Sequence, residues 1–333
     1  MNLQQRIDLL IRLGEYILEN NESWKQAKQD AERQNSWFTP EFTDLASVNI
    51  ANQFLQAEKL LAFTHAYLLT DEATLLPKTV GLVMAGNIPL VGFHDWMCIF
   101  LSGHKAFIKS SSKDEILIKH LLDQLISWNP DVFDQSVFGG ILKGSDAYIA
   151  TGSNNSARYF EYYFNKYPNI IRRNRTSVAI LNGNETKDDL KRLSDDIHLY
   201  FGLGCRNVTK IYVPAEYDFV ALLSAFEKYE YFIDHHKYKN NYDYQLAIHL
   251  LNHKYYMTNG TLLLSENSSI FSPISQLNYE FYTDQETLKK LLEENRDIQC
   301  IVGEGYLPFG NSQYPSLTDF ADGTDTMKFL LQL

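Results

Sequence analysis

Short apolar runs alternate with helix-like segments along most of this chain, and this alternation limits the folds that it can adopt. The first such run follows Lys78, and stretches with helical periodicity separate it from the later ones. The runs that we expect to be strands cover residues 79–84, 106–109, 136–142, 147–150 and 177–181. Strands that alternate with helices form parallel βαβ units. The sequence therefore predicts an α/β protein with parallel sheets.

The chain is long enough for two such lobes. It has 333 residues, 45% of them hydrophobic, and a domain typically takes about 150 residues. Residues 1–75 carry amphipathic helices that we expect to cover the first lobe, which spans residues 76–184. A second α/β lobe and the C-terminal segment span residues 185–333. The Asn-Gly-Asn turn near residues 183–186 is the signal for the boundary between the lobes.

Charge and hydropathy exclude two classes of partner. The net charge is −11 and the pI is near 5.3, whereas nucleic-acid binding requires a basic field, so we expect no nucleic-acid partner. The chain lacks the run of about 20 apolar residues that a membrane span requires, and its first thirty residues carry no apolar leader. Its three cysteines are far apart and odd in number, which fits a reducing compartment. We therefore expect a cytoplasmic protein.

Cys205 differs from the other two cysteines in its surroundings. It lies in the segment FGLGCRN, where two glycines precede it and an arginine follows it. A cationic neighbour and converging N–H groups lower the pKa of a thiol, and glycines allow a turn tight enough to present the sulfur. This pattern favours a nucleophile, although a cysteine can also fill a buried turn. We give that second interpretation to Cys98 and Cys300, which lie in apolar runs.

A second candidate segment is GLVMAGNIPLVGF, which places Asn87 and Pro89 directly after a predicted buried strand. Sheets of α/β proteins bind ligands at the carboxyl edge of their strands. An amide at that edge can donate to an oxyanion, but the same residue types also fit a turn or a helix N-cap. The residues themselves leave both roles open.

These segments belong to a longer series of motifs. The stretch GNIPLVGFHDWMCIFLSGHKAFIKSSSKDE, the loop YIATGSNN and the segment FGLGC follow one another as in the aldehyde dehydrogenase superfamily, which they resemble from about Lys78 to Phe309. The segments FGLGCRNVTK and PFGNSQYPSLTDF look most like the LuxC-type acyl-CoA reductases, which reduce fatty acyl thioesters to aldehydes. The resemblance implies an aldehyde-dehydrogenase-like fold, with a Rossmann-type dinucleotide-binding lobe and a second α/β lobe that carries the catalytic cysteine.

The resemblance also implies roles for individual residues. Cys205 falls on the catalytic cysteine, and Asn87 falls on the oxyanion-hole asparagine. Lys109 falls on the lysine that contacts the adenine ribose of the cofactor, and Ser269 stands where a ribose-binding glutamate would be. The nicotinamide cofactor is expected beside a loop of three small residues, Thr151, Gly152 and Ser153.

Departures from ordinary aldehyde dehydrogenases refine the expectation. Ile171 occupies the position of their general-base glutamate, and an enzyme that takes its acyl group from a thioester does not need that base to activate water. Ser112 replaces an acidic residue that would repel a ribose 2′-phosphate, and Lys113 adds positive charge, so NADPH is favoured over NADH. The short chain also leaves the quaternary structure open, with a homo-oligomer as one possibility.

Two further clusters allow other interpretations. His249 and His253 are spaced i, i+4 on a predicted helix, but no glutamate follows His249 as in His-Glu-x-x-His, so we expect packing or surface roles and no metal. The basic cluster of Arg172, Arg173 and Arg175 could hold phosphates, although solvated ion pairs are the simpler expectation for an acidic protein.

The sequence thus predicts an NADPH-dependent reductase of an acyl-CoA or acyl-carrier thioester that works through a Cys205 acyl-enzyme. A non-redox cysteine acyltransferase that uses acyl-CoA is the main alternative, and it would turn over acyl groups without the cofactor. A binding protein descended from such an enzyme is a third, and it would hold a dinucleotide without reacting with thioesters.

Overall fold

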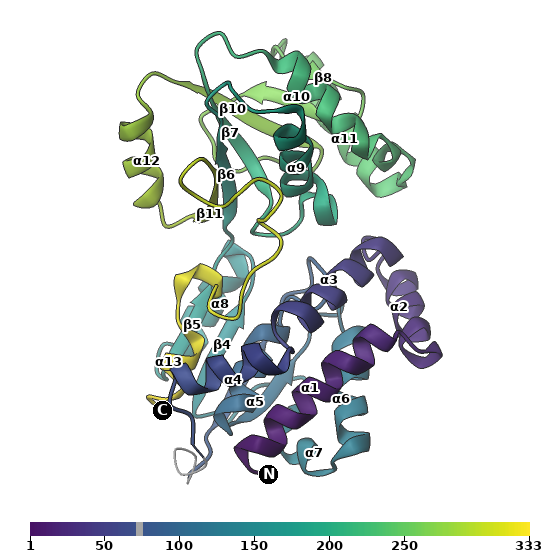
Figure 1. Ribbon diagram of the computed structural model, residues 1–333, viewed down its shortest axis with the longest axis vertical. Helices are drawn as coiled ribbons and strands as arrows, with labels where there is room; N and C mark the ends of the chain where they lie inside the picture. The colour runs from purple at the N-terminus through teal and green to yellow at the C-terminus, as the bar shows by residue number, and fades with distance from the viewer. Residues whose placement is uncertain (71–75) are drawn as a thin grey trace. The chain divides into compact units, whose positions relative to one another are not determined.

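The computed structural model describes residues 1–70 and 76–333, which form two compact units (Figure 1). Unit 1 comprises Met1–Asn174 with Pro315–Leu333, and unit 2 comprises Arg175–Tyr314. The division precedes the expected one near residues 183–186, because strand β6 (Thr176–Ile180) pairs with strands of unit 2. The expected boundary after residue 75 adjoins residues 71–75, which lie outside the described residues.

Four helices begin unit 1. They are α1 (Leu3–Glu19), α2 (Glu22–Gln34), α3 (Pro40–Gln53) and α4 (Ala57–Ala66). The break between α1 and α2 is made by two asparagines. Asn20 adopts the left-handed conformation with φ 50°, and the Asn21 side chain accepts a hydrogen bond from the Trp24 N–H at 3.0 Å.

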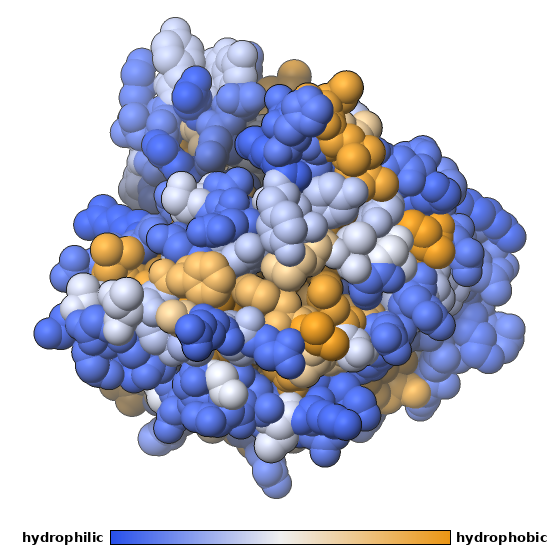
Figure 2. Space-filling view, turned by 90° about the horizontal axis from the view of Figure 1, so that it is seen from above, coloured by the Kyte–Doolittle hydropathy of each residue, from blue (hydrophilic) through white to orange (hydrophobic). Residues whose placement is uncertain are grey.

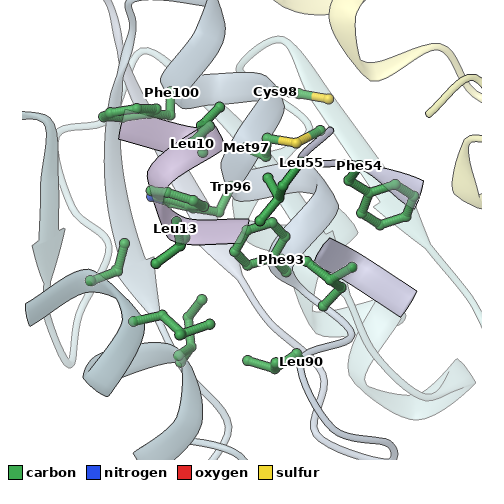
Figure 3. Packing of buried hydrophobic residues seen from close by; sticks show 14 of the residues in the cluster. Leu10, Leu13, Phe54, Leu55, Leu90, Phe93, Trp96, Met97, Cys98 and Phe100 are labelled. Carbon is green, nitrogen blue, oxygen red and sulfur yellow. The ribbon is translucent and has the colours of Figure 1, made fainter. Parts of the chain in front are cut away.

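These N-terminal helices are part of the core of unit 1. Leu10 and Leu13 of α1 lie among Trp96, Met97 and Phe100 of helix α5 (Phe93–Ser102), and all five side chains are buried (Figure 3). Burial of large apolar side chains contributes about 1.5–3 kcal/mol each. The first helix is therefore needed to complete the core rather than being an accessory cover.

A five-stranded parallel sheet lies in unit 1. Its strands are β1 (Thr79–Val83), β2 (Lys105–Lys109), β3 (Ser136–Phe138), β4 (Ala147–Thr151) and β5 (Asn169–Arg172), in the order β3-β2-β1-β4-β5. The connecting helices after α5 are α6 (Ile116–Trp128), α7 (Asp131–Gln135) and α8 (Asn154–Phe164). The strand order reverses between β1 and β4, and such a switch point is where doubly wound sheets bind ligands, at the carboxyl edge.

The C-terminal segment returns to unit 1, where helix α13 (Thr326–Leu330) packs against α5 (Figure 1). Arg172, at the end of β5, is only 2% exposed and forms an ion pair with Asp95 of α5. Arg172 also donates to the Thr326 hydroxyl at 2.8 Å, and that hydroxyl donates to Asp95 at 3.2 Å. This buried triad joins three segments that are far apart in the sequence.

Unit 2 is built on a six-stranded sheet. Its strands are β6, β7 (Val208–Pro214), β8 (Met257–Thr258), β9 (Leu263–Glu266), β10 (Gln276–Tyr282) and β11 (Ile298–Gly303), in the order β11-β6-β7-β10-β9-β8. All neighbouring strands in this sheet are parallel except β8 and β9. The predicted α/β class with parallel sheets is thus confirmed in both units.

The two faces of this sheet carry separate cores. Ala179 of β6 packs in a cluster with helices α9 (Lys187–His198) and α10 (Phe219–Ala225). Its neighbour Val178 packs in another cluster with α12 (Gln285–Glu293). Successive side chains of a strand point to opposite faces, so β6 contributes to both cores.

The described residues contain no helix that is both long enough and apolar enough to cross a membrane. Figure 2 shows hydrophilic side chains over most of one face, with apolar side chains gathered in patches between them.

Candidate active site

The turn that carries Cys205 lies in unit 2, between α9 and β7. Just before it, Tyr200, Phe201 and Gly202 all have positive φ, at 55°, 56° and 73°. Such conformations cost free energy for non-glycine residues, and they persist only where the surroundings fix them. The sequence predicted a tight turn from its glycines, but not that an aromatic pair takes part in it.

Asn207 holds this turn through its side chain. Its amide nitrogen donates to the carbonyl oxygens of Asp196, Ile197 and Leu199 at 3.2, 3.3 and 2.8 Å. Its amide oxygen accepts from the Gly204 N–H at 2.8 Å. Asn207 is fully buried, so these bonds are shielded from water and fix the end of α9 against the start of β7.

Both peptide groups that flank the Cys205 Cα are held by hydrogen bonds. The Gly204 carbonyl, which shares a peptide plane with the Cys205 N–H, accepts from the Asn207 N–H at 3.1 Å. The Cys205 carbonyl accepts from the Ser177 hydroxyl at 3.1 Å. With both planes fixed, the directions of the Cys205 Cα–Cβ bond and of its N–H are also fixed. A nucleophile and an oxyanion donor can thus be set in advance on one residue.

Ser177 also links the turn to a second thiol. Its oxygen accepts from the Cys300 N–H at 3.2 Å and lies 2.9 Å from the Cys300 sulfur. The single proton of the hydroxyl goes to Cys205, so the Cys300 S–H donates to Ser177. Burial raises the pKa of Cys300 to about 11, although the positive charge of Arg206 opposes that shift. Cys300 is therefore a thiol at neutral pH, and a hydrogen-bond donor to the residue that holds Cys205.

The three cysteines differ in their surroundings, and none forms a disulfide in the described part of the chain. Cys98 is fully buried in the core of unit 1, and burial raises its pKa well above the usual range. Cys205 is half-buried in the held turn. Because a thiolate must be both formed and reached, Cys98 is unsuited to nucleophilic attack.

The other candidates follow strands at the carboxyl edge of the unit 1 sheet. Asn87 is exposed and follows β1, Lys109 is exposed and ends β2, and Thr151 ends β4. The register pairs Val83 of β1 with Lys109 on one side and with Ala150 on the other. The structure thus brings these candidates to a single sheet edge, whereas Cys205 belongs to unit 2.

The loop after β4 is packed tightly against its helix. Ser153 caps α8 by accepting from the Ser156 N–H at 3.2 Å. A Cβ atom on Gly152 would lie 2.9 Å from side-chain atoms of Phe160 and Ser156, so only glycine fits there without a shift. The start of α8 therefore lies directly after the strand, and a helix N-terminus at that place favours an anionic ligand.

The loop after β2 is held by helix α2. Ser112 is exposed, and its carbonyl accepts from the Gln34 side chain at 2.8 Å. The carbonyl of Lys113 accepts from the Asn35 side chain at 3.3 Å. The N-terminal helices thereby position the loop that was predicted to select the cofactor.

Asp114 is a residue of this edge that sequence reasoning missed. It is buried and accepts a hydrogen bond from the Leu90 N–H at 2.6 Å, which holds the turn that contains Asn87. Leu90 has a φ of 57°, so this turn needs such support. Burial raises the pKa of Asp114 to about 7, against the effect of the Leu90 hydrogen bond. No local pattern in KSSSKDE indicated the contact.

The remaining residues that the sequence analysis singled out make contacts within the fold. Arg173 pairs with Glu161 at the surface, as expected for a solvated ion pair, whereas the pair of Arg172 with Asp95 is buried and not solvated. Ile171 lies half-buried on β5. The Ser269 hydroxyl donates to the Phe271 carbonyl at 2.9 Å, within its own loop. His249 bonds to Gln276, and the described residues hold no cluster of three or more potential metal ligands.

The family model for acyl-CoA reductase (LuxC) matches residues 73–260. This chain belongs to the LuxC acyl-CoA reductase family. The resemblance predicted from the motifs is thereby confirmed, and the matched part of this LuxC family member contains Asn87, Lys109 and Cys205. The match to this family supports, at a general level, the reduction of an acyl-CoA to an aldehyde by this chain. No curated protein matches the chain.

Solved structures of aldehyde dehydrogenases share the fold of this LuxC family member. Aldehyde dehydrogenase 21 from Physcomitrella patens, in complex with succinate, superposes with a TM-score of 0.70 at 10% identity, over 100% of this chain and 84% of its own. The aldehyde dehydrogenase KauB from Pseudomonas aeruginosa gives 0.66 at 12% identity, over 91% and 72%. A Mycobacterium tuberculosis aldehyde dehydrogenase complexed with NAD+ gives 0.62 at 13% identity, over 87% and 71%. The predicted aldehyde-dehydrogenase-like fold is confirmed.

Proposed function

We propose that this LuxC family member reduces a fatty acyl thioester to the aldehyde through an acyl-enzyme on Cys205, with NADPH as the reductant. The observation that carries the proposal is the held turn, in which hydrogen bonds from Ser177 and Asn207 fix both peptide groups that flank Cys205. Two of the three residues with positive φ in this turn, Tyr200 and Phe201, are not glycines, and backbone strain of this kind clusters at functional sites. Presentation of a nucleophile accounts for it.

In the first step, the Cys205 thiolate attacks the thioester carbonyl, and a C–S bond to Cys205 forms. The Cys205 N–H donates to the resulting oxyanion, and the resemblance gives the Asn87 side-chain amide the same role. The C–S bond to the donor then breaks, and the departing thiolate takes up a proton to leave as the free thiol. The Cys205 acyl-enzyme that remains is itself a thioester.

The residues at the edge of the unit 1 sheet suit a dinucleotide. Lys109 offers an exposed ammonium group at the end of β2, and the capped start of α8, at Thr151–Ser153, offers a helix N-terminus beside the switch point of the sheet. A related M. tuberculosis enzyme of this fold is complexed with NAD+. When bound, a nicotinamide cofactor would supply the hydride that converts the acyl-enzyme to aldehyde and releases the Cys205 thiolate.

The choice of NADPH rests on the loop after β2. Ser112 is neutral and Lys113 is cationic, and both are exposed. A 2′-phosphate carries negative charge, so an ammonium group and a hydroxyl at this loop favour the phosphorylated cofactor. The hydrogen bonds from Gln34 and Asn35, at the C-terminal end of α2, limit how far the loop can move to adapt to the other cofactor.

The absence of a base at Ile171 supports reduction over hydrolysis. A half-buried apolar side chain on β5 cannot activate water, so the acyl-enzyme persists long enough for hydride transfer. The same feature fits a substrate that enters as a thioester rather than as an aldehyde to be oxidised.

The test is NADPH oxidation, followed by absorbance, with acyl-CoA substrates of increasing chain length. The wild-type protein should consume NADPH only when acyl-CoA is present, and Cys205→Ala should abolish consumption, whereas Cys98→Ala should leave it unchanged. If radiolabelled acyl groups attach to Cys205 while NADPH stays intact, the protein is a non-redox acyltransferase and the proposal is wrong.

A further inference from the structure

A cavity of about 610 Å³ opens in unit 2 between α11 (His236–Leu251) and the β9–β10 edge of the sheet. Side chains from α11, from the end of β9 and from the start of β10 form its wall. The proposed chemistry at Cys205 uses none of these residues. Such a volume is in the range of small-ligand sites.

His249 gives the cavity a defined polar group. The Asn278 amide nitrogen donates to the carbonyls of Ser269 and Phe271, each at 3.0 Å, so its oxygen must be the acceptor for Gln276 Nε2 at 2.9 Å. The Gln276 oxygen is then the acceptor for His249 Nε2, at 3.1 Å. This chain of bonds places the imidazole proton on Nε2.

The other nitrogen of His249 is consequently a bare acceptor. The residue is 5% exposed, and among residues 1–70 and 76–333 nothing bonds to Nδ1. An unmet buried acceptor is costly, and a ligand that donates an N–H or O–H group there would recover that cost. One of the residues that line the cavity thus has an acceptor without a donor among the residues that the structure describes.

The charges on the wall describe the ligand further. Lys254 and Glu266 have opposite charge, and within the described residues neither forms an ion pair. The formal charges of these two side chains sum to zero, so the wall of the cavity carries no net charge that would attract a phosphate group or an ammonium group. Ile248 and Pro273 add apolar surface. A neutral ligand with amide or hydroxyl groups and an apolar segment fits this combination.

The cavity also adjoins the Cys205 turn. Pro273 and Gln276 line it and line a second, much smaller cavity whose wall includes Gly202 of that turn. A ligand beside Pro273 therefore lies next to residues that also line the small cavity at the nucleophile turn.

We propose that the α11 cavity binds the pantetheine arm of the acyl thioester, an inference that rests on the proposed function. Pantetheine is uncharged and carries two amide groups, a hydroxyl and a branched apolar segment. An N–H or O–H group of the arm donates to His249 Nδ1, its carbonyls accept from Lys254, and its methyl groups contact Ile248 and Pro273. Coenzyme A and an acyl carrier protein present the same arm, so the cavity accepts either donor while the nucleotide or the carrier stays outside.

The test begins with D-pantetheine as a free probe, titrated into the full-length protein and followed by saturation-transfer NMR. Wild type should bind it, and His249→Phe should weaken binding about tenfold, because one buried hydrogen bond is lost. Ile248→Trp, which fills the cavity from a half-buried position, should weaken it as well. His253→Phe is the matched control, since His253 is exposed and lies outside the cavity wall.

Kinetics then separate this inference from the proposed function. His249→Phe should raise KM for acyl-CoA about tenfold, while p-nitrophenyl octanoate, which has no pantetheine, should acylate Cys205 at the wild-type rate. Acyl carrier protein as donor shows whether the carrier form depends on His249 in the same way. An unchanged KM, or equal loss with the ester, would overturn the inference. If the wild type reduces no acyl thioester but still binds pantetheine at His249, the proposed function alone has failed.

Discussion

Ser177 and Cys205 are joined by a hydrogen bond of 3.1 Å from the serine hydroxyl to the cysteine carbonyl. The bond crosses from β6 to the nucleophile turn, and it helps to fix the direction of the Cys205 side chain. The serine is fully buried, so no water replaces it as a donor.

Ser177→Ala should therefore slow the acylation of Cys205 about tenfold, the equivalent of about 1.4 kcal/mol, because the carbonyl loses its donor. Single-turnover labelling with an acyl-CoA measures this rate. Ser194→Ala serves as the control, since Ser194 is an equally buried serine of the same unit on α9. Equal rates for wild type and Ser177→Ala would show that the turn keeps its geometry without the hydrogen bond from Ser177.

The pKa of Cys300 predicts which cysteines react with alkylating agents. At pH 8 iodoacetamide should modify Cys205, while Cys300, with a pKa raised to about 11, should react far more slowly. The labelling of Cys300 should rise as the pH approaches 11, because only then does the thiolate form. Mass spectrometry of tryptic peptides measures each site. Modification of Cys300 as fast as Cys205 at pH 8 would contradict the assignment.

Asp114 should make stability depend on pH. Its pKa is raised from 3.8 to about 7 in the folded protein, so the folded state binds a proton that the unfolded state loses between those values. The unfolding free energy should therefore fall as the pH rises from about 4 to about 7, by an amount on the order of a few kcal/mol. Asp114→Asn keeps an acceptor for Leu90 but cannot ionise, so its Tm relative to wild type should rise over that interval. A difference in Tm that stays constant with pH would count against the assignment.

Two adjacent arginines offer a comparison of buried and exposed ion pairs. Arg172→Leu leaves Asp95 buried without its cation and should lower the free energy of unfolding by about 3–5 kcal/mol. Arg173→Leu removes an exposed pair with Glu161 and should cost less than about 1 kcal/mol. Guanidinium denaturation followed by tryptophan fluorescence measures both. Equal losses would mean that the Arg172 pair is not a structural link.

Lys113 should set the preference between cofactors. Lys113→Ala removes the exposed ammonium group beside Ser112 and should raise KM for NADPH about tenfold, with little change in KM for NADH. Lys119→Ala, an exposed lysine on α6, is a control for the loss of charge. If both values of KM rise together, Lys113 does not distinguish the two cofactors.

Local patterns were sufficient for the parts of this protein that depend on neighbouring residues. The strand runs after Lys78 and the glycines around Cys205 predicted a parallel α/β fold and a tight turn. The contacts that complete the site come from elsewhere in the chain, as with Ser177 and Cys300, which are 123 positions apart. Neither residue lies in a distinctive motif, so no local signal could have found the pair.

The predicted boundary between the two lobes differs from the division in the structure for a related reason. The Asn-Gly-Asn turn resembles a linker, but β6 before it hydrogen-bonds to β7 and β11, which fixes it in unit 2. The last helix likewise joins unit 1 through Arg172 and Asp95 rather than through any sequence neighbour.

The return of the C-terminal segment to unit 1 has a consequence for the order in which the protein can fold as it is synthesised. Arg175–Tyr314 is continuous, so unit 2 has its whole sheet as soon as residue 314 has emerged. Unit 1 must wait for α13, and until then Arg172 and Asp95 lack the Thr326 hydroxyl that joins them. Synthesis of unit 1 thus begins before that of unit 2, but unit 1 is completed after unit 2.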